Sequence, residues 1–388
     1  MLACLTTILL VGGAVPALQD RASDPDAALQ AFVHAERRAQ LPGLAAVVVR
    51  SDGTPRVYVS GERRIGKGDL IAAGDRMHLG SLTKAITATL VGALAEQRVM
   101  TLETTIGETF PELLPKMQAA YRKVTVRQLL THAAGLPTYG TNIALLPLLS
   151  LSGTPTEQRY AFVERVLAEP PRFDPGTSFE YSNAGAVVAG AMAERIAGAP
   201  YRDLVERLVF APIGAHVAFG NPGLAAEPQP WGHRTVLGTV IEVPPAQPLH
   251  TSPLAIEPAG GASPSLPDYG RFVQLHLRGL RGRDGPLKAR TIQELHGLGP
   301  DTHTRRPAMG WNRMPREGGD SHEHRGSYGA YVGFATIQPS RDVAVAVFTN
   351  LGGRQDLRDV VASIALRIAA RYSTDDKVES DLMVTDRR

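Results

Sequence analysis

Helical and strand-like hydrophobic patterns alternate along the chain, and the strand-like runs are gathered near its two ends. Near the N-terminus, two β-type runs flank Asp52-Gly53, a dipeptide typical of a tight hairpin turn. Near the C-terminus, two runs rich in Val, Ala and Phe predict adjacent antiparallel strands. The predicted strands are 44–50, 56–60, 331–337 and 343–348, and the predicted helices are 27–40, 82–97, 126–132, 156–168, 184–196, 268–280 and 357–372.

A proline-rich segment interrupts this order. Residues 221–268 contain ten prolines and little helical period, which predicts extended loops and short strands. Strands at both ends with helices between them predict a mixed α/β fold. We expect an antiparallel sheet lobe, flanked by N- and C-terminal helices, with an all-helical lobe inserted in it. Within one domain at 20–372, the predicted sheet lobe is about 27–78 and 250–372, the helical lobe about 79–249, and 373–388 a polar tail.

The N-terminal segment predicts an exported protein. Residues 1–18 carry no charged side chain, are mostly apolar from Leu5 to Val15, and offer small residues for cleavage at Val15-Pro16-Ala17. Residues 1–19 therefore predict a secretory signal peptide and a periplasmic or secreted location. An uncleaved membrane anchor is the alternative, because about 17 apolar residues is the shortest span. No later segment is long and apolar enough to cross a bilayer, so no stable membrane insertion is expected once the signal is removed.

Composition excludes several classes of function. The 41 basic and 38 acidic residues give a net charge of only +3, which does not favour a nucleic-acid partner. The single cysteine, Cys4, excludes an intramolecular disulfide, a cysteine-based metal site and a CxxC redox pair. Because Cys4 lies in the predicted signal peptide, thiol catalysis is also excluded from the mature protein.

Three familiar motifs are incomplete. The glycine-rich stretch 61–68 has Gly68 where a phosphate-binding loop needs Ser or Thr. His322-Glu323-His324 lacks the helical spacing and the third ligand of a zinc site. The stretch that begins at Gly176 ends in Glu instead of the glycine of a G-x-S-x-G elbow. No metal and no cofactor are expected.

A serine and a lysine provide the first candidate for catalysis. Lysine is scarce, and the only Ser-x-x-Lys of the chain runs from Ser81 to Lys84. If Ser81 opens a helix, Lys84 lies one turn along on the same face, where a buried amine can take the serine proton. The helix N-terminus also favours negative charge at a carbonyl under attack. The alternative is that Ser81 only caps the helix and that Lys84 is a surface residue.

Tyr181 and Asn183 form a second candidate element. They follow the turn-forming Asp174-Pro175-Gly176, which predicts that both lie on a loop. A tyrosine beside a lysine ammonium can relay a proton to a leaving group, and an asparagine amide can bind both a lysine and a substrate carbonyl. Packing of Tyr181 at the edge of the core is the alternative.

His324-Arg325-Gly326 is the third element and begins a run of small and β-branched residues. A cation at position 324 on an edge strand can bind a substrate carboxylate or assist proton transfer. Gly326 would let a substrate approach the strand backbone. The backbone N–H groups of Ser327 and Ser81 can then form an oxyanion hole. A solvated polar turn is the alternative.

The three elements in this order resemble the motifs of the serine β-lactamase and penicillin-binding superfamily. Within it, they look most like the branch of class C β-lactamases, D-Ala-D-Ala carboxypeptidases, D-aminopeptidases and β-lactamase-like esterases. Residues 126–137, VRQLLTHAAGLP, are similar to the LLxHxSGLP stretch of this branch. Phe173-Asp174-Pro175-Gly176 and Gly260-Gly261 also fit, and the resemblance covers about residues 27–372.

The resemblance implies a role for each candidate residue. Ser81 corresponds to the acylated nucleophile, and Lys84 and Tyr181 to the residues that share the acid and base work. The residues with implied roles in substrate binding, as orienting amide, third-motif cation or oxyanion hole, are Asn183, His324, Arg325, Gly326 and Ser327.

The chain also departs from the family pattern. The third motif of class C β-lactamases is Lys-Thr-Gly, whereas a peptidase type has His-Thr-Gly. Arg325 stands where threonine contacts a substrate carboxylate, and it either binds an anion with two hydrogen bonds or points to solvent. Efficient β-lactam hydrolysis is therefore not expected. Ala134 replaces the usual serine beside His132, which we interpret as structural, and Trp311 either lines the pocket or packs in the core.

The sequence thus predicts a serine acyl-hydrolase that works through an acyl-enzyme on ester, amide or β-lactam carbonyls. Its expected substrates are small molecules or peptides, cell-wall peptides among them. A penicillin-binding sensor or interaction module on the same fold, acylated without turnover, is the alternative. Acyl transfer to an acceptor other than water also stays open.

Overall fold

The computed structural model describes residues 25–37, 41–247, 253–299, 307–316 and 318–371. The predicted signal peptide at 1–19 and the predicted tail at 373–388 lie outside these residues. None of the helices in the described part of the chain has the length and apolar character needed to cross a membrane.

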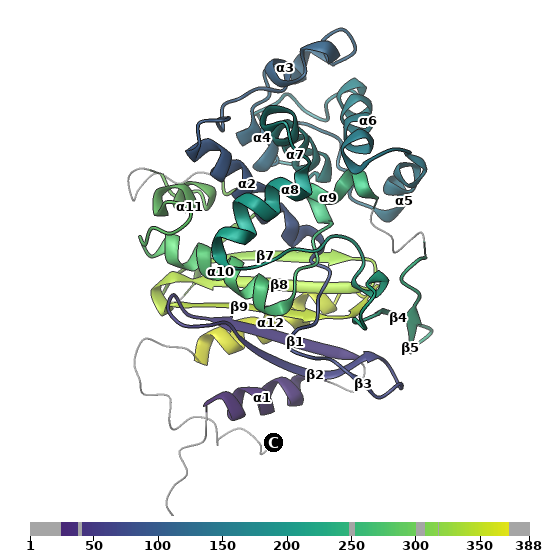
Figure 1. The fold of residues 1–388 in the computed structure, drawn as a ribbon, viewed down its shortest axis with the longest axis vertical. Coiled ribbons are helices and arrows are strands. Elements are labelled where there is room, and N and C mark those ends of the chain that lie inside the picture. The colour runs from purple at the N-terminus through teal and green to yellow at the C-terminus, as the bar shows by residue number, and fades with distance from the viewer. Residues whose placement is uncertain (1–24, 38–40, 248–252, 300–306, 317, 372–388) are drawn as a thin grey trace, which may run out of the picture.

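An antiparallel sheet is built from both ends of the chain and lies below the helical lobe in Figure 1. Its seven strands are ordered β3-β2-β1-β9-β8-β7-β6. The strands are β1 (Gly43–Val49), β2 (Arg56–Arg64), β3 (Asp69–Leu70), β6 (Asn312–Arg316), β7 (Gly319–Tyr328), β8 (Tyr331–Gln338) and β9 (Val343–Thr349). Because β6 pairs only with the first half of β7, the second half of β7 is an edge.

Helices cover both faces of this sheet. Alternate residues of β9 point into two different cores. One core is shared with α1 (Pro25–Glu36) and α12 (Leu357–Arg371), and the other with α10 (Leu266–Leu280) and the helical lobe. A strand that is buried on both faces must be apolar throughout, which is why the sequence shows it as a continuous run.

The helical lobe is arranged around α2 (Thr83–Glu96), which is buried from Thr83 to Leu94. Capping boxes at Thr105, Thr125 and Thr154 begin three of its helices. These three are α3, α4 and α6. Besides α1, α2, α10 and α12, the α-helices of the described residues are α3 (Ile106–Thr109), α4 (Val126–Leu130), α5 (Asn142–Leu145), α6 (Pro155–Ala168), α7 (Asn183–Ala197), α8 (Tyr201–Val205), α9 (Glu257–Gly260) and α11 (Ala289–Leu295).

The predicted mixed α/β fold with an antiparallel sheet lobe is confirmed, and each predicted helix and strand corresponds to an observed element whose ends differ by a few residues. The insertion differs at one end. β4 (Gly232–Val236) and β5 (Thr239–Val243) pair with β10 (Leu351–Gly352) in a second, three-stranded sheet. The predicted helical lobe at 79–249 therefore includes a hairpin that is not helical. Its two strands lie in the segment 221–268, where short strands were expected, and only their pairing with β10 joins distant parts of the chain.

Candidate active site

Ser81 lies on a short 3-10 helix, Gly80–Leu82, that leads directly into α2. Gly80 has a left-handed φ of +52°, and a Cβ there would lie 2.6 Å from the carbonyl carbon of Ser327. Its N–H donates to Nδ1 of the buried His78, 3.1 Å away. Neither helix uses Ser81 as its N-cap, so the capping alternative is wrong and the hydroxyl lines a cleft.

Lys84 follows one turn later and is only 2% exposed, so it is not a surface residue. Its Nζ donates to Asn183 Oδ1 at 2.7 Å, to the backbone carbonyl of Ala259 at 2.8 Å and to Ser81 Oγ at 3.4 Å. These three contacts fix the position of Nζ. Lys84 is thus held directly beneath the serine. No sequence motif marks Ala259, because a backbone carbonyl has no residue signature.

Tyr181 ends the loop before α7, and its hydroxyl donates to Ser81 Oγ at 2.7 Å. The Tyr181 ring also faces Lys84, whose Nζ lies 4.9 Å from the ring centroid. Tyr181 is 39% exposed and lines the cleft, so it is not a core-packing residue. The structure therefore brings the serine, the lysine and the tyrosine to one point.

Asn183 is the first residue of α7, whereas the sequence placed it on a loop. The side chain of Ser182 caps this helix, which ends the loop one residue earlier. Asn183 Nδ2 donates to the Tyr139 carbonyl at 2.7 Å, and this bond turns Oδ1 toward Lys84. Tyr139 itself has a left-handed φ of +45°. The sequence analysis missed this support, which no local motif indicates.

His132 supports the tyrosine. Its ring centroid lies 4.7 Å from that of Tyr181, and its Nδ1 accepts from the Ser182 N–H at 3.3 Å. Burial, together with the charge of Lys84, lowers the pKa of His132 to about 4, so the ring is a neutral acceptor at pH 7. The contacts of His132 are with Tyr181 and the Ser182 backbone, which agrees with a structural role.

His324 lines the opposite wall of the cleft, on β7, and is 6% exposed. Burial and the nearby charge of Lys84 lower the pKa of His324 to about 3. The expected cation at this position is therefore a neutral imidazole at pH 7. The Gly310 backbone accepts from the ring, and Nδ1 has no hydrogen-bond partner among the described residues.

Gly326 serves close packing within the chain. A Cβ at this position would lie 2.2 Å from the carbonyl oxygen of Leu79, in the turn before Ser81. The sequence analysis expected Gly326 to admit a substrate, and the structure shows that it admits the protein's own backbone. The same approach brings the main chain of Ser327 against Gly80. The two expected oxyanion-hole segments are thus neighbours.

Arginine side chains from three elements, β6, β7 and α12, reach this wall. Arg325 Nη1 lies 2.6 Å from Asp359 Oδ1 on α12, so its guanidinium is paired. Arg316 likewise pairs with Glu323. Arg358, also on α12, donates from Nη2 to Ser327 Oγ at 2.9 Å, and it has no carboxylate within ion-pair distance among the described residues. The sequence analysis missed Arg358, because in the sequence it is an ordinary charged residue of an amphipathic helix.

These groups surround a cleft of about 640 Å³ between the helical lobe and the edge of β7. Its lining mixes the polar groups above with apolar side chains, among them Leu145, Ile256, Met314 and Tyr328. Trp311 is not part of the lining: it is buried, and it stacks on His296 with ring centroids 5.0 Å apart. Of the two alternatives for Trp311, the structure therefore supports core packing.

Three buried histidines lie behind the β7 wall. His276, His296 and His322 form a hydrogen-bonded chain with contacts of 2.9 and 3.0 Å, which ends on the Thr89 hydroxyl at 3.0 Å. Burial is the main cause that lowers the pKa of all three rings, to about 3 for His276 and about 4 for His322. Within the described ranges, no group of three or more His, Cys, Asp or Glu side chains is arranged to hold a metal ion.

A nucleophile-type serine, a buried lysine and a tyrosine in a cleft between an antiparallel sheet and a helical lobe define a serine-hydrolase type of site. A family model described as Beta-lactamase matches residues 26–369. The chain belongs to the beta-lactamase family.

Two curated relatives and one solved structure are similar to this chain. Penicillin-binding protein 4 of Amycolatopsis lactamdurans is 26% identical over 322 residues, 80% of this chain and 81% of that protein. Lovastatin esterase of Penicillium rubens is 25% identical over 172 residues, 41% of this chain and 42% of that protein. The solved structure of a D-stereospecific amidohydrolase from Streptomyces sp. covers 88% of this chain and 98% of its own, with a TM-score of 0.66 and 23% identity. At that identity the amidohydrolase shows the fold alone.

Proposed function

We propose that this protein is a serine acyl-hydrolase that forms an acyl-enzyme on Ser81. The observation that carries the proposal is the convergence of two side chains, Lys84 and Tyr181, on the hydroxyl oxygen of Ser81. Ser81 Oγ lies 2.7 Å from the Tyr181 hydroxyl and 3.4 Å from Lys84 Nζ, at the base of an open cleft. A serine hydroxyl needs an adjacent base to become a nucleophile, and both neighbours are suited to that work.

In the proposed acylation step, Ser81 Oγ attacks the substrate carbonyl carbon and passes its proton to the Lys84–Tyr181 pair. The carbonyl oxygen becomes negative between the main-chain N–H groups of Ser81 and Ser327, at the N-terminal end of α2. Tyr181 then gives a proton to the leaving alcohol or amine as the carbon–leaving-group bond breaks. Water completes the cycle: its oxygen bonds to the acyl carbon, the bond between that carbon and Ser81 Oγ breaks, one water proton returns to Ser81 Oγ, and the carboxylic acid is released.

The substrates proposed are small molecules or peptides with an ester, amide or β-lactam carbonyl, cell-wall peptides among them. The mixed polar and apolar lining of the cleft favours a substrate that carries both kinds of group. The family relatives, which include a penicillin-binding protein and an esterase, support the same range of carbonyls. Arg358 supplies the charge that an anionic substrate group would need.

Intact-mass labelling tests the proposal. Benzylpenicillin and a fluorophosphonate are incubated separately with the wild type and with Ser81→Ala. We expect a single covalent adduct on the wild type with at least one reagent, and none on the variant. No adduct on the wild type with either reagent, or equal adducts on both proteins, would contradict the proposal.

A substrate panel then separates turnover from simple acylation. Nitrocefin, a D-Ala-D-Ala peptide and p-nitrophenyl butyrate are assayed side by side, and we expect steady-state product from at least one. A burst without steady-state product on all three would instead select the non-turnover sensor.

A further inference from the structure

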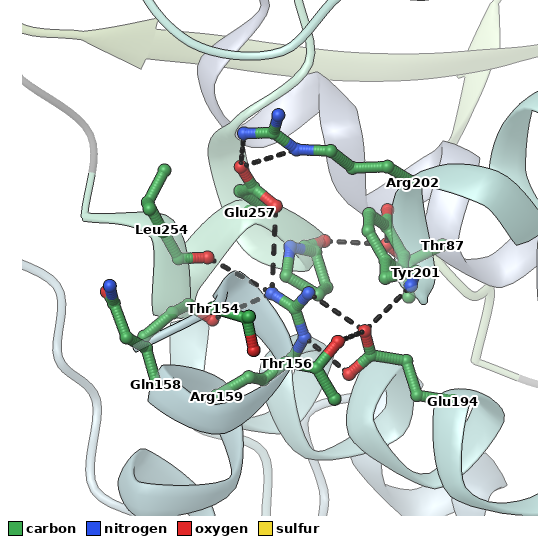
Figure 2. A network of polar contacts seen from close by, with 12 residues as sticks. Thr87, Thr154, Thr156, Gln158, Arg159, Glu194, Tyr201, Arg202, Leu254 and Glu257 are labelled. Atoms are coloured by element: carbon green, nitrogen blue, oxygen red, sulfur yellow. Dashed lines mark hydrogen bonds and ion pairs between the residues drawn. The ribbon is translucent and has the colours of Figure 1, made fainter. Parts of the chain in front are cut away.

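A cluster of buried charges lies on the helical-lobe side of the cleft and takes no direct part in the proposed chemistry (Figure 2). Arg159 on α6 is 1% exposed, and its two acidic neighbours, Glu194 on α7 and Glu257 on α9, are also buried. None of the three lines the cleft that holds Ser81. A fully buried guanidinium is costly unless it is paired, so its contacts indicate its role.

Arg159 joins α7 to the segment 254–260. On one side, its Nε and Nη2 donate to the Glu194 carboxylate at 2.8 and 3.1 Å. On the other side, Nη1 donates to the backbone carbonyls of Leu254 and Ala255 at 3.1 and 3.4 Å. The same Nη1 lies 3.8 Å from Glu257 Oε2, as Figure 2 shows.

The segment 254–260 carries the carbonyl that binds the lysine. The Pro258 carbonyl accepts from the Thr87 hydroxyl at 2.6 Å, and the next carbonyl, that of Ala259, accepts from Lys84 Nζ at 2.8 Å. Pro258 also packs directly on α7, because a Cβ at Gly190 would lie 2.5 Å from its ring. Small movements of this segment therefore change the contact with Lys84.

We propose that Arg159 is a positioning residue for Lys84, and that it acts by fixing the segment 254–260 so that the Ala259 carbonyl accepts from the lysine. This inference rests on the proposed function, in which Lys84 takes the Ser81 proton. An acceptor at Nζ holds the amine near Ser81. Arg159 thus sets the geometry of the base without contact with substrate.

Two kinds of variant test this role. Arg159→Lys keeps the charge beside Glu194, but one ammonium does not reproduce the fork that also reaches the segment 254–260. Arg159→Met combined with Glu194→Gln removes the guanidinium without leaving a buried carboxylate unpaired, because Glu257 keeps its ion pair with Arg202. The second variant keeps the test valid if one of the two fails to fold.

The sheet lobe provides a matched control. Arg63 also binds two carboxylates, with Nη1 2.8 Å from Asp69 and Nη2 2.8 Å from Asp75, and Asp75 is buried. Arg63→Lys, and Arg63→Met with Asp75→Asn, make the same chemical changes away from the cleft. Any general loss of stability is thus common to both series.

The readout is the rate of fluorophosphonate labelling of Ser81, measured over a range of reagent concentrations, with the melting temperature of each variant. For the Arg159 series we expect the plateau rate to fall by about tenfold. We also expect the reagent concentration that gives the half-maximal rate to stay within about twofold of the wild-type value, because Arg159 does not line the cleft. The Arg63 series should keep both values.

Two results would overturn the inference. One is an Arg159 series whose plateau labelling rate matches that of the Arg63 series, even with a lower melting temperature. The other is an unchanged plateau rate with a raised half-saturating reagent concentration. The wild type and Ser81→Ala are measured in the same experiment, so failure of the proposed function, seen as no Ser81-dependent labelling, is distinguished from a failure confined to Arg159.

Discussion

Along the helical wall of the cleft the polar side chains converge on Ser81 and Lys84, whereas along the β7 wall they pair with one another or with α12. Lys84, Tyr181 and Asn183 all lie within hydrogen-bond distance of Ser81 or of each other. On the β7 wall, by contrast, His324 is neutral and Arg325 pairs with α12. The comparison suggests that the helical wall supplies the chemistry and the β7 wall supplies recognition.

Removal of the lysine should have the largest effect. Lys84→Ala deprives Ser81 of its buried base, and we expect kcat/KM for p-nitrophenyl butyrate to fall by about 10³-fold or more. The control is Lys116→Ala, since Lys116 is an exposed lysine that pairs with Glu164 on the surface. If kcat/KM of Lys84→Ala stays within a few-fold of the wild-type value, the proposed chemical role of the helical wall is contradicted.

Removal of the phenol should have a smaller effect on the same wall. Tyr181→Phe keeps the ring over Lys84 but loses the hydroxyl at 2.7 Å from Ser81, and we expect a fall in kcat of about 10²-fold. The loss should be larger for an amide than for a p-nitrophenyl ester, whose leaving group needs no proton. Tyr160→Phe, which removes a phenol bonded to Glu112, is the control. Equal losses on both substrates would argue against proton delivery by Tyr181.

On the β7 wall, Arg358 is expected to read anionic substrates. We expect Arg358→Ala to lower kcat/KM for a D-Ala-D-Ala peptide by about tenfold to a hundredfold, because a charge-assisted hydrogen bond is lost. The neutral p-nitrophenyl butyrate should change by less than about twofold. Arg325→Ala is the matched control, because its guanidinium is already paired with Asp359. If Arg325→Ala produces the selective loss and Arg358→Ala does not, the assignment of these two arginines must be exchanged.

The histidines behind the β7 wall predict an acid-sensitive fold. The folded-state pKa values of His276 and His322 are lowered from 6.5 to about 3 and about 4, so the unfolded chain binds more protons as pH falls below 6.5. Their contribution is fully present above pH 6.5 and is lost as pH falls toward those values. At about pH 5, each such ring costs up to about 2 kcal/mol of unfolding free energy.

Urea unfolding at about pH 7 and about pH 5 measures this loss. We expect His322→Gln to reduce the drop in unfolding free energy between the two pH values, by about the contribution of one ring. The exposed His216, which pairs with Glu206 on the surface, provides the control variant His216→Gln. If the drop in unfolding free energy is the same in His322→Gln as in the wild type, protonation of the three buried histidines does not cause the loss of stability in acid.

The helical wall was largely predictable, because its signals are local. Residues three apart on a helix share a face, so Ser81 and Lys84 were expected to meet. In the structure Lys84 Nζ lies 3.4 Å from Ser81 Oγ. The turn before Tyr181 was also predicted from the sequence. The hydrogen bond from Lys84 to the Ala259 carbonyl was not predicted, because it joins residues 175 positions apart.

The β7 wall was predicted less well. The sequence analysis expected a cation at His324, but burial beside Lys84 makes the ring neutral, and burial is a property of the whole fold. For Arg325 the sequence analysis left two alternatives, binding of an anion or exposure to solvent. In the structure its guanidinium pairs with Asp359 of α12. Arg358 reaches the cleft only because α12 packs across the sheet beside β7.

By itself the sequence determined the periodic and local features: the strands that are apolar on both faces, the main helices and the spacing of serine, lysine and tyrosine elements. These follow from repeats of two and 3.6 residues, which any short window of the chain reveals. Only the tertiary structure decided which side chains are charged, which are paired and which backbone carbonyls face the lysine. Those properties depend on desolvation and on contacts between distant segments, and no short window contains either.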